Sequence, residues 1–216
     1  MPPCTIMKYI LGKKENMSQL FDDDKGKVVA VTIVSAGPIY VTQIKTKEKD
    51  GYGALQFGYG LKKILKIKKP QRMKTEGISE GLSGFSYHKE TRTDKNVSDL
   101  DLKQGDKIIA SVFEEGDKVR VSGVTKGKGF QGVVKRHGFH GGPRSHGQKH
   151  SEREPGSIGS SGIQRVIKGM RMGGRMGSDR QTTQNLKIIK VDEEKNLLYI
   201  SGAVPGRRGT LIEIKG

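Results

Sequence analysis

Residues 27–46 read KVVAVTIVSAGPIYVTQIKT and carry the strand signal from which we predict the fold. β-Branched residues recur through 27–34 and again through 39–46, and such runs are typical of strands that pack one face on a core. Ser-Ala-Gly-Pro at 35–38 is a turn signal between them. We predict that the two segments form a hairpin.

Two more segment pairs have the same form, and we predict that they are two further hairpins. DKIIASVF at 106–113 and KVRVSGVT at 118–125 flank Glu-Glu-Gly-Asp, and NLKIIKVD at 185–192 and NLLYISGAV at 196–204 flank Glu-Glu-Lys. Short strands at this spacing favour an antiparallel sheet that closes on itself rather than a parallel one. The predicted fold class is therefore mainly β, a small closed antiparallel β-barrel.

A different pattern separates the first pair from the second. From residue 60 to residue 90, apolar and basic residues mix without strand alternation, and Pro70 interrupts the run. We predict a short helical insertion near 58–90. Its basic stretch KKILKIKK, at 62–69, is either a solvated helix face or a contact with RNA, and the sequence leaves both open.

Charge and glycine are concentrated in one part of the chain. The chain has 216 residues, 32% of them hydrophobic, and a formal net charge of +17. Residues 123–178 hold 11 of the 40 Lys and Arg residues and 15 of the 31 Gly residues, but only two acids, Glu152 and Glu154. We predict a barrel body at 1–122, a basic glycine-rich extension at 123–178, and closing barrel strands at 179–216. This excess of positive charge requires an anionic partner.

The extension is predicted to bind RNA. Its glycines make ordering costly and leave it mobile when alone, so an external partner must supply the energy of ordering. The same glycines forbid the amphipathic helix with which a protein binds a membrane surface. The predicted RNA-binding side chains are Lys126, Lys128, Phe130, Lys135, Arg136, His137, Phe139, His140, Arg144, His146, Lys149, His150, Arg153, Arg165, Lys168, Arg171 and Arg175. Glycine lets backbone lie close to phosphates, and the glycines assigned this role are Gly127, Gly129, Gly132, Gly156 and Gly159.

The roles of the two extension phenylalanines stay open. Either ring can stack on an unpaired base or wedge under a bent strand. For Phe130 we favour packing on the rim of the barrel, and for Phe139, deeper in the extension, we favour stacking. Met170, Met172 and Met176 are interpreted as adaptable packing against the body or RNA rather than a cofactor site.

The sequence offers no enzyme chemistry. The four histidines of the extension have metal-like spacings, but cations surround them and no acid lies between them, so no metal site is predicted. Ser145 and Ser151 lack an orienting acid for a triad, because Glu152 and Glu154 are expected to pair with Arg153 or Lys149. Phosphate-loop and dinucleotide-binding motifs are absent. We predict no catalytic residue, no cofactor and no small-molecule substrate.

The chain is predicted to be soluble and cytoplasmic. Nowhere do 18 apolar residues run together, and the start has no apolar signal region. Cys4 is the single cysteine, which excludes an intrachain disulfide. Met7 is an alternative initiator to Met1, since the patterned sequence begins at Lys8.

Around GVTKGKGFQGVVKR, at 123–136, the chain closely resembles the family of the third protein of the large ribosomal subunit, in its bacterial form. The signature residues at the family's spacing are Phe113, Gly123, Thr125, Gly127, Lys128, Gly129, Gly132 and Arg136. Further matching segments are ILGKKENMSQLF, DGYGALQFGYG, EPGSIG, KGMRMGGRMG and GAVPGRRG, at 10–21, 50–60, 154–159, 168–177 and 202–209. They cover nearly the whole chain in the family's order.

The resemblance implies a structural constituent of the large ribosomal subunit rather than an enzyme. It implies a barrel of the translation-factor type, direct binding to large-subunit ribosomal RNA, an early role in subunit assembly, and contacts with neighbouring ribosomal proteins. It also implies that the extension reaches toward the peptidyl-transferase centre. The alternatives are an assembly chaperone with a basic loop and, from another class, a histidine-metal hydrolase.

Three departures from the family pattern stand out. Arg120 replaces the usual Asp or Asn and Asn16 the usual Gly, so we expect local turns or pairings to differ there. The segment GSIGSSGIQRVIKG, at 156–169, is one residue shorter than in common relatives and lacks their Pro-Gly. Some relatives carry a methylated glutamine in this region, but Gln164 is out of register with it, and we do not predict that modification.

Overall fold

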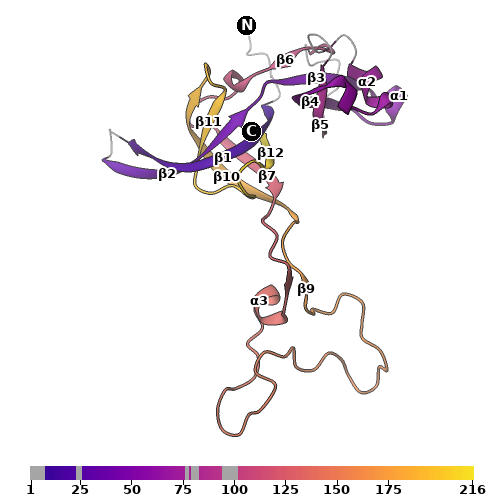
Figure 1. Cartoon of the computed structure of the whole chain (residues 1–216), viewed down its shortest axis with the longest axis vertical. Helices are drawn as coiled ribbons and strands as arrows, with labels where there is room; N and C mark the ends of the chain where they lie inside the picture. The colour runs from indigo at the N-terminus through magenta and orange to yellow at the C-terminus, as the bar shows by residue number, and fades with distance from the viewer. Residues whose placement is uncertain (1–7, 23–25, 76–77, 79–82, 94–101) are drawn as a thin grey trace. The chain divides into compact units, whose positions relative to one another are not determined.

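The computed structural model describes residues 8–22, 26–75, 78, 83–93 and 102–216 (Figure 1). The predictions about Cys4 and about Met1 or Met7 as initiator lie outside these residues. Among them, strands predominate, which confirms the mainly β prediction. In chain order the elements are β1 (Tyr9–Asp22), β2 (Lys27–Ala36), β3 (Ile39–Lys45), α1 (Lys47–Asp50), β4 (Ala54–Lys63), η1 (Ile64–Lys66), α2 (Lys69–Thr75), β5 (Ser83–Arg92), β6 (Lys107–Ile108), η3 (Ala110–Val112), β7 (Lys118–Val124), β8 (Phe130–Gln131), α3 (Val133–His137), β9 (Gly174–Arg175), β10 (Arg180–Asp192), β11 (Leu197–Ser201) and β12 (Leu211–Lys215).

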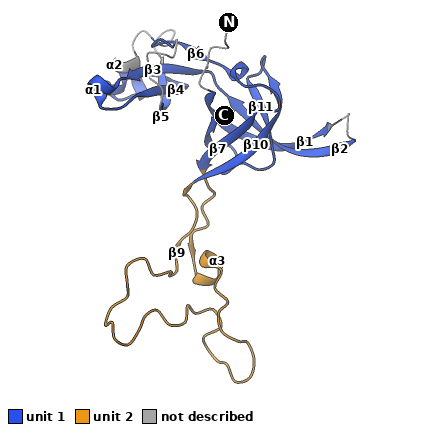
Figure 2. Ribbon diagram, turned by 180° about the vertical axis from the view of Figure 1, so that it is seen from behind, with its two compact units in different colours: residues 1–123, 181–216 blue, residues 124–180 orange. Residues whose placement is uncertain are grey.

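The chain divides into two compact units (Figure 2). Unit 1 consists of residues 1–123 and 181–216, and unit 2 of residues 124–180. Unit 2 is therefore an insertion between β7 and β10, and both of these strands belong to the same sheet of unit 1.

Six strands of unit 1 form a closed barrel in the order β1-β12-β7-β10-β11-β2, and β2 pairs again with β1. β1 thus lies between β2 and β12, so strands from the two ends of the chain pair with each other. β1 and β12 are antiparallel, with Ile10 opposite Ile214. Because side chains alternate between the faces of a strand, every second residue of β12 points into the barrel; Ile212 and Ile214 are fully buried.

A second sheet, in the order β5-β4-β3-β6, shares the core of the barrel. Tyr9 of β1 stacks on Phe57 of β4 with ring centroids 5.0 Å apart. At the edge of this sheet, Lys45 Nζ lies 2.6 Å from Glu90 Oε2. The hydrogen bond from Lys45 holds the pKa of Glu90 below its ordinary value.

Two of the three predicted hairpins are wrong. β2 pairs with β1 and β11, whereas β3 pairs with β4 and β6, so the turn at 35–38 carries the chain from one sheet to the other. The N–H of Gly37 still donates to Leu11 O at 3.0 Å, which keeps the chain on β1 instead of reversing it along β2. Likewise β6 pairs with β3 and β7 with β12. The predicted hairpin at 185–204 is confirmed, because β10 and β11 are antiparallel neighbours.

The insertion predicted as helical near 58–90 is mostly sheet. β4 and β5 form a long antiparallel pair from Ala54–Arg92 to Lys63–Ser83, and among the described residues of 58–90 the helical elements are η1 and α2. The alternation that marks β4 lies in residues 55–59, where Leu55, Phe57 and Tyr59 are buried. Pro70 lies in the first turn of α2, where its missing N–H costs no hydrogen bond, so it helps to begin this helix rather than to end one.

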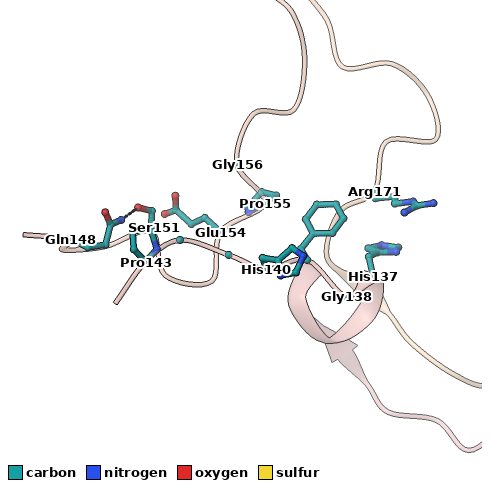
Figure 3. A pocket seen from close by; sticks show the side chains of 13 residues that line it. His137, Gly138, His140, Pro143, Gln148, Ser151, Glu154, Pro155, Gly156 and Arg171 are labelled. Atoms are coloured by element: carbon teal, nitrogen blue, oxygen red, sulfur yellow. Dashed lines mark hydrogen bonds between the residues drawn. The ribbon is translucent and has the colours of Figure 1, made fainter. Parts of the chain in front are cut away.

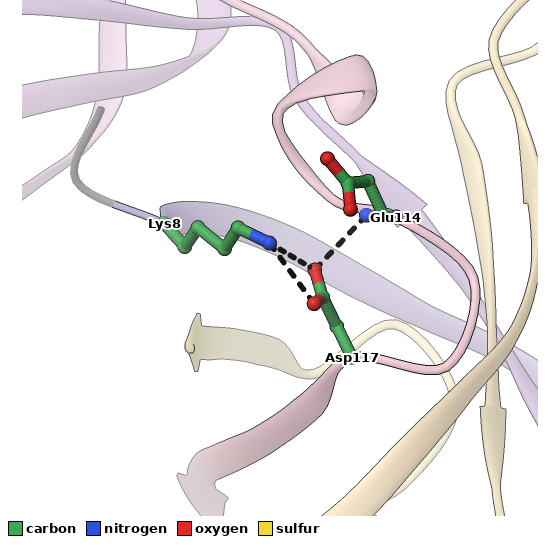
Figure 4. A network of polar contacts seen from close by, with 3 residues as sticks. All are labelled: Lys8, Glu114 and Asp117. Carbon is green, nitrogen blue, oxygen red and sulfur yellow. Dashed lines mark hydrogen bonds and ion pairs between the residues drawn. The ribbon is translucent and has the colours of Figure 1, made fainter. Parts of the chain in front are cut away.

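A polar network ties the start of the described chain to the loop before β7 (Figure 4). Lys8 Nζ donates to both carboxylate oxygens of Asp117, at 2.9 and 2.7 Å, and the N–H of Glu114 donates to Oδ2 at 3.0 Å. Partial burial would raise the pKa of Asp117, but these hydrogen bonds outweigh it and hold the pKa below its ordinary value.

Candidate nucleic-acid interface

Unit 2 begins as a two-stranded stem made from its own ends. The N–H of Thr125 donates to Asp179 O at 2.9 Å, and the N–H of Lys128 donates to Met176 O at 2.9 Å. Farther along, β8 pairs with β9, with Phe130 opposite Arg175. These bonds satisfy the backbone of the stem without an outside partner, so the stem needs no RNA to hold it together. The mobility predicted for the isolated extension stays a prediction for its loops.

The short helix α3 is fastened to the returning strand by two of its basic side chains. Arg136 Nη1 donates to Met172 O at 2.8 Å, and His137 Nε2 lies 3.0 Å from the same oxygen. A Cβ at Gly174 would lie 2.6 Å from Arg136 Nη1, so a larger residue there would displace the guanidinium. Arg136 and His137 therefore organise unit 2 in addition to any role toward RNA.

A first loop, residues 138–153, closes on itself through backbone and charge. The N–H of Gly142 donates to Glu152 O at 3.0 Å. A Cβ at Gly141 would lie 2.1 Å from that same oxygen, which only glycine avoids. Arg144 Nε lies 2.5 Å from Glu152 Oε1, so the partner of Glu152 is Arg144 and not the predicted Arg153 or Lys149.

A hollow of about 640 Å³ opens between this loop, the end of α3 and the returning chain (Figure 3). Its lining comes from residues 137–143, 148, 151, 154–156 and 171, all within unit 2. Glycines and prolines supply much of the wall, and the chemically distinctive side chains are His137, His140, Glu154 and Arg171. The volume lies in the range of small-ligand sites. The spacing of these four side chains in the sequence does not indicate that they line one hollow.

A second loop, residues 154–171, exposes aliphatic side chains among its cations. Ile158, Ile163, Val166, Ile167 and Met170 are each between 38% and 55% exposed. Ile158 and Ile163 are not among the predicted interface residues. The density of aliphatic residues in an acid-poor, glycine-rich segment is the signal that would have found them.

Most predicted RNA-binding side chains lie on the surface of unit 2. Arg136, His137 and Phe139 are half-buried. The exposed ones are Lys126, Lys128, Phe130, Lys135, His140, Arg144, His146, Lys149, His150, Arg153, Arg165, Lys168, Arg171 and Arg175. Arg175 also forms an ion pair with Asp179, with a 3.7 Å separation of Nη2 and Oδ1.

The two phenylalanines differ in exposure within unit 2. The side chain of Phe130 is 78% exposed, and its packing on the rim of the barrel stays a prediction. Phe139 is half-buried, with its ring centroid 6.0 Å from that of His137. Phe130 is thus the ring free to stack on a base, and Phe139 presents only part of its surface.

The glycines assigned to close approach differ in their surroundings. Gly132 has open space where a Cβ would stand and an ordinary φ, so an external group has room there. Gly129 and Gly156 also face open space, but their φ values of +66° and +76° require glycine for the backbone itself. A Cβ at Gly127 would lie 2.9 Å from Ser178 Oγ, while Gly159 has only a distant neighbour.

Within the described ranges, no three His, Cys, Asp or Glu side chains lie close enough together to hold a metal ion. No helix in the described part of the chain is long and apolar enough to cross a membrane.

Comparison with known proteins decides the family. The family model described as ribosomal protein L3 matches residues 89–197. A relative from Finegoldia magna, named large ribosomal subunit protein uL3, is 46% identical over 209 residues, covering 97% of either chain. The chain belongs to the ribosomal protein L3 family.

Two further relatives from the L3 family are similar to this chain over nearly its whole length. Proteins named large ribosomal subunit protein uL3 from Rhodococcus erythropolis and Mycolicibacterium vanbaalenii are 51% and 49% identical, over 98% and 96% of this chain and 94% of each relative. The resemblance found in the sequence is confirmed. L3 proteins are structural components of the ribosome, so this chain is a ribosomal protein and not an enzyme. The relatives are named as proteins of the large subunit, which is cytoplasmic in bacteria, and the predicted localisation agrees.

Proposed function

We propose that this chain is built into the large ribosomal subunit as a structural constituent that binds large-subunit ribosomal RNA directly through unit 2. The observation that carries the proposal is the surface of unit 2. Its Lys and Arg side chains other than Arg136 are exposed, and two of its three acids are already paired with arginines. Such a surface attracts a polyanion along its whole length.

Binding combines electrostatics with close backbone approach. Exposed cations such as Lys126, Lys128 and Lys149 displace counterions from RNA, so affinity falls with salt by about 0.7 to 0.9 log-log units for each phosphate neutralised. Open space at Gly132 leaves room for a phosphate against the backbone. The exposed ring of Phe130 stacks on an unpaired base.

The remaining roles follow from the family resemblance. The barrel of unit 1 is of the translation-factor type and contacts neighbouring ribosomal proteins. The extension, predicted at 123–178, reaches toward the peptidyl-transferase centre and folds RNA there early in subunit assembly. It braces the RNA and does not itself transfer peptides.

Crosslinking in intact cells tests this function. RNA nucleotides attached to residues 123–178 are mapped after irradiation. Crosslinks that converge on a few sites of large-subunit ribosomal RNA near the catalytic centre support the proposal. Crosslinks scattered over many RNAs would instead favour an assembly chaperone, which a high-salt wash would also remove from purified large subunits.

A further inference from the structure

Unit 2 has three acidic residues, and one of them marks a candidate binding site. They are Glu152, Glu154 and Asp179. Arg144 pairs with Glu152 at 2.5 Å, and Arg175 lies 3.7 Å from Asp179. Glu154 has no ion-pair partner within the described parts of the chain; it is exposed, and it lines the hollow. A carboxylate without a cation is costly beside the phosphates of RNA unless it accepts a hydrogen bond from another part of the nucleotide.

The hollow is electrically asymmetric. Glu154 lies on the side formed with Ser151 and Gln148, while Arg171 and His137 lie on the opposite side (Figure 3). An anion therefore fits one side, and a group rich in hydrogen-bond donors fits the other. One nucleotide has this pair of features, since its phosphate is anionic and the edge of its base carries N–H groups.

We propose that the hollow binds one unpaired guanosine of the RNA, with the carboxylate of Glu154 accepting hydrogen bonds from the N1–H and N2–H groups of the base. Arg171 pairs with the phosphate, and the partly exposed ring of Phe139 supplies an apolar face for the base. The proposal rests on the proposed function, because it specifies which nucleotide an RNA-binding unit selects.

The choice of guanine follows from the pattern of donors and acceptors. Its Watson–Crick edge carries two adjacent donors, which match the two oxygens of a carboxylate. Adenine and cytosine each place a ring-nitrogen acceptor beside their amino group, and uracil places its one N–H between two carbonyl oxygens. These acceptors would face the carboxylate and repel it, so only guanine makes both bonds.

The test measures base preference with the whole chain. Short fluorescent oligouridines that carry one central guanosine, inosine or adenosine are titrated with the protein at fixed salt, and binding is followed by anisotropy. We expect the guanosine RNA to bind about tenfold more tightly than the adenosine RNA, the discrimination usual for a good bidentate pair. Inosine, which lacks the 2-amino group, should fall between them.

Glu154→Gln removes the carboxylate and should reduce the guanosine preference to less than about twofold. Asp179→Asn is the matched control, because it removes the same charge from an exposed side chain of unit 2 that lies outside the hollow. It should keep the preference. Glu154→Ala should behave as Glu154→Gln does, since the side chain is exposed and its loss does not threaten folding.

Three results would overturn the inference. The first is equal affinity for all three RNAs, and the second is a guanosine preference that survives Glu154→Gln. The third is an equal gain in affinity for every RNA in Glu154→Gln, which would show that the carboxylate only repels phosphate. In these cases RNA still binds and the proposed function stands, whereas a protein that binds none of the RNAs at any salt overturns both.

Discussion

Asp117 shows how one residue makes part of the fold depend on pH. Its carboxylate receives hydrogen bonds from Lys8 Nζ and from the N–H of Glu114, and its pKa is lowered in spite of partial burial. A lowered pKa in the folded state means that the stabilisation is complete above the ordinary pKa of Asp and is lost as pH falls through the folded value.

Asp117→Asn should lower the free energy of unfolding by roughly 1 kcal/mol at neutral pH. The difference from the unchanged protein should shrink below about pH 4 and vanish in stronger acid. Urea unfolding at a series of pH values, followed by tyrosine fluorescence, measures it. Asp50→Asn, on the exposed helix α1, is the control and should show no such trend. A difference that does not change with pH would mean that the packing of Asp117, not its charge, supports the loop.

Arg120 is expected to destabilise the barrel slightly. It lies opposite Lys215 in the antiparallel pair of β7 and β12, and like charges that face each other across strands destabilise a sheet. Arg120→Asp should therefore raise the free energy of unfolding by roughly 0.5 kcal/mol, and Arg120→Gln by less. Thermal unfolding at low and high salt measures the effect, which salt should weaken. No gain at low salt would show that the two side chains avoid each other.

At the scale of single residues, the sequence shows the charge of a segment but not the contacts that each side chain makes. The cationic, acid-poor character of the extension can be seen directly in the sequence. The structural role of Arg136 and His137 cannot, because their partner is a backbone carbonyl, Met172 O, 35 or more residues away. The same limit applies to Glu154, whose place beside residues 137–143 depends on a loop that sequence spacing does not define.

At the scale of elements, strands are easier to predict than their partners. The alternation of buried residues in β2 and β3 marks both as strands, yet Val34 faces the core from the barrel and Ile39 faces it from the second sheet. A period of two identifies a buried face and does not say which neighbour supplies the hydrogen bonds. β1 was not predicted as a strand, since polar residues occupy its middle.

The stem of unit 2 offers a prediction about glycine. A Cβ at Gly177 would lie 2.2 Å from Lys126 O, and its φ is +75°, so Gly177→Ala should disrupt the stem. Hydrogen exchange at the amides of Lys128 and Met176 should accelerate by at least roughly tenfold, because these amides donate the stem's bonds.

Gly132→Ala is the matched substitution for that experiment. A methyl group fits there without strain, so exchange in the stem should stay slow while RNA affinity falls if phosphate lies against this backbone. Normal affinity with Gly132→Ala would contradict close approach at this position. Slow exchange with Gly177→Ala would contradict the stem itself.

At the scale of the molecule, the two units can be observed separately. All six tyrosines lie outside residues 124–180, and the chain has no tryptophan. Tyrosine circular dichroism in the near ultraviolet therefore reports on unit 1, whereas RNA binding is expected to report on unit 2.

Replacing Lys126, Lys128, Lys135 and Lys149 together by Ala should leave the tyrosine signal unchanged and weaken RNA binding. The slope of log affinity against log salt should fall by about 0.7 to 0.9 for each phosphate that the variant no longer neutralises. The control removes four exposed lysines of unit 1, Lys47, Lys49, Lys190 and Lys195, with the same change in net charge. Equal losses of affinity in the two variants would assign binding to net charge, and a lost tyrosine signal would show that unit 1 needs unit 2 in order to fold.

The position of β12 sets an order of events during synthesis. This strand, made from residues 211–215, lies between β1 and β7, so the ring of hydrogen bonds stays open until nearly the whole sequence has been translated. Unit 2 is complete about thirty residues earlier. A nascent chain therefore displays its cationic segment while its barrel is still open. If unit 2 binds RNA as proposed, contact with RNA can begin before the barrel is complete, and an unfinished chain can already be held at its binding site.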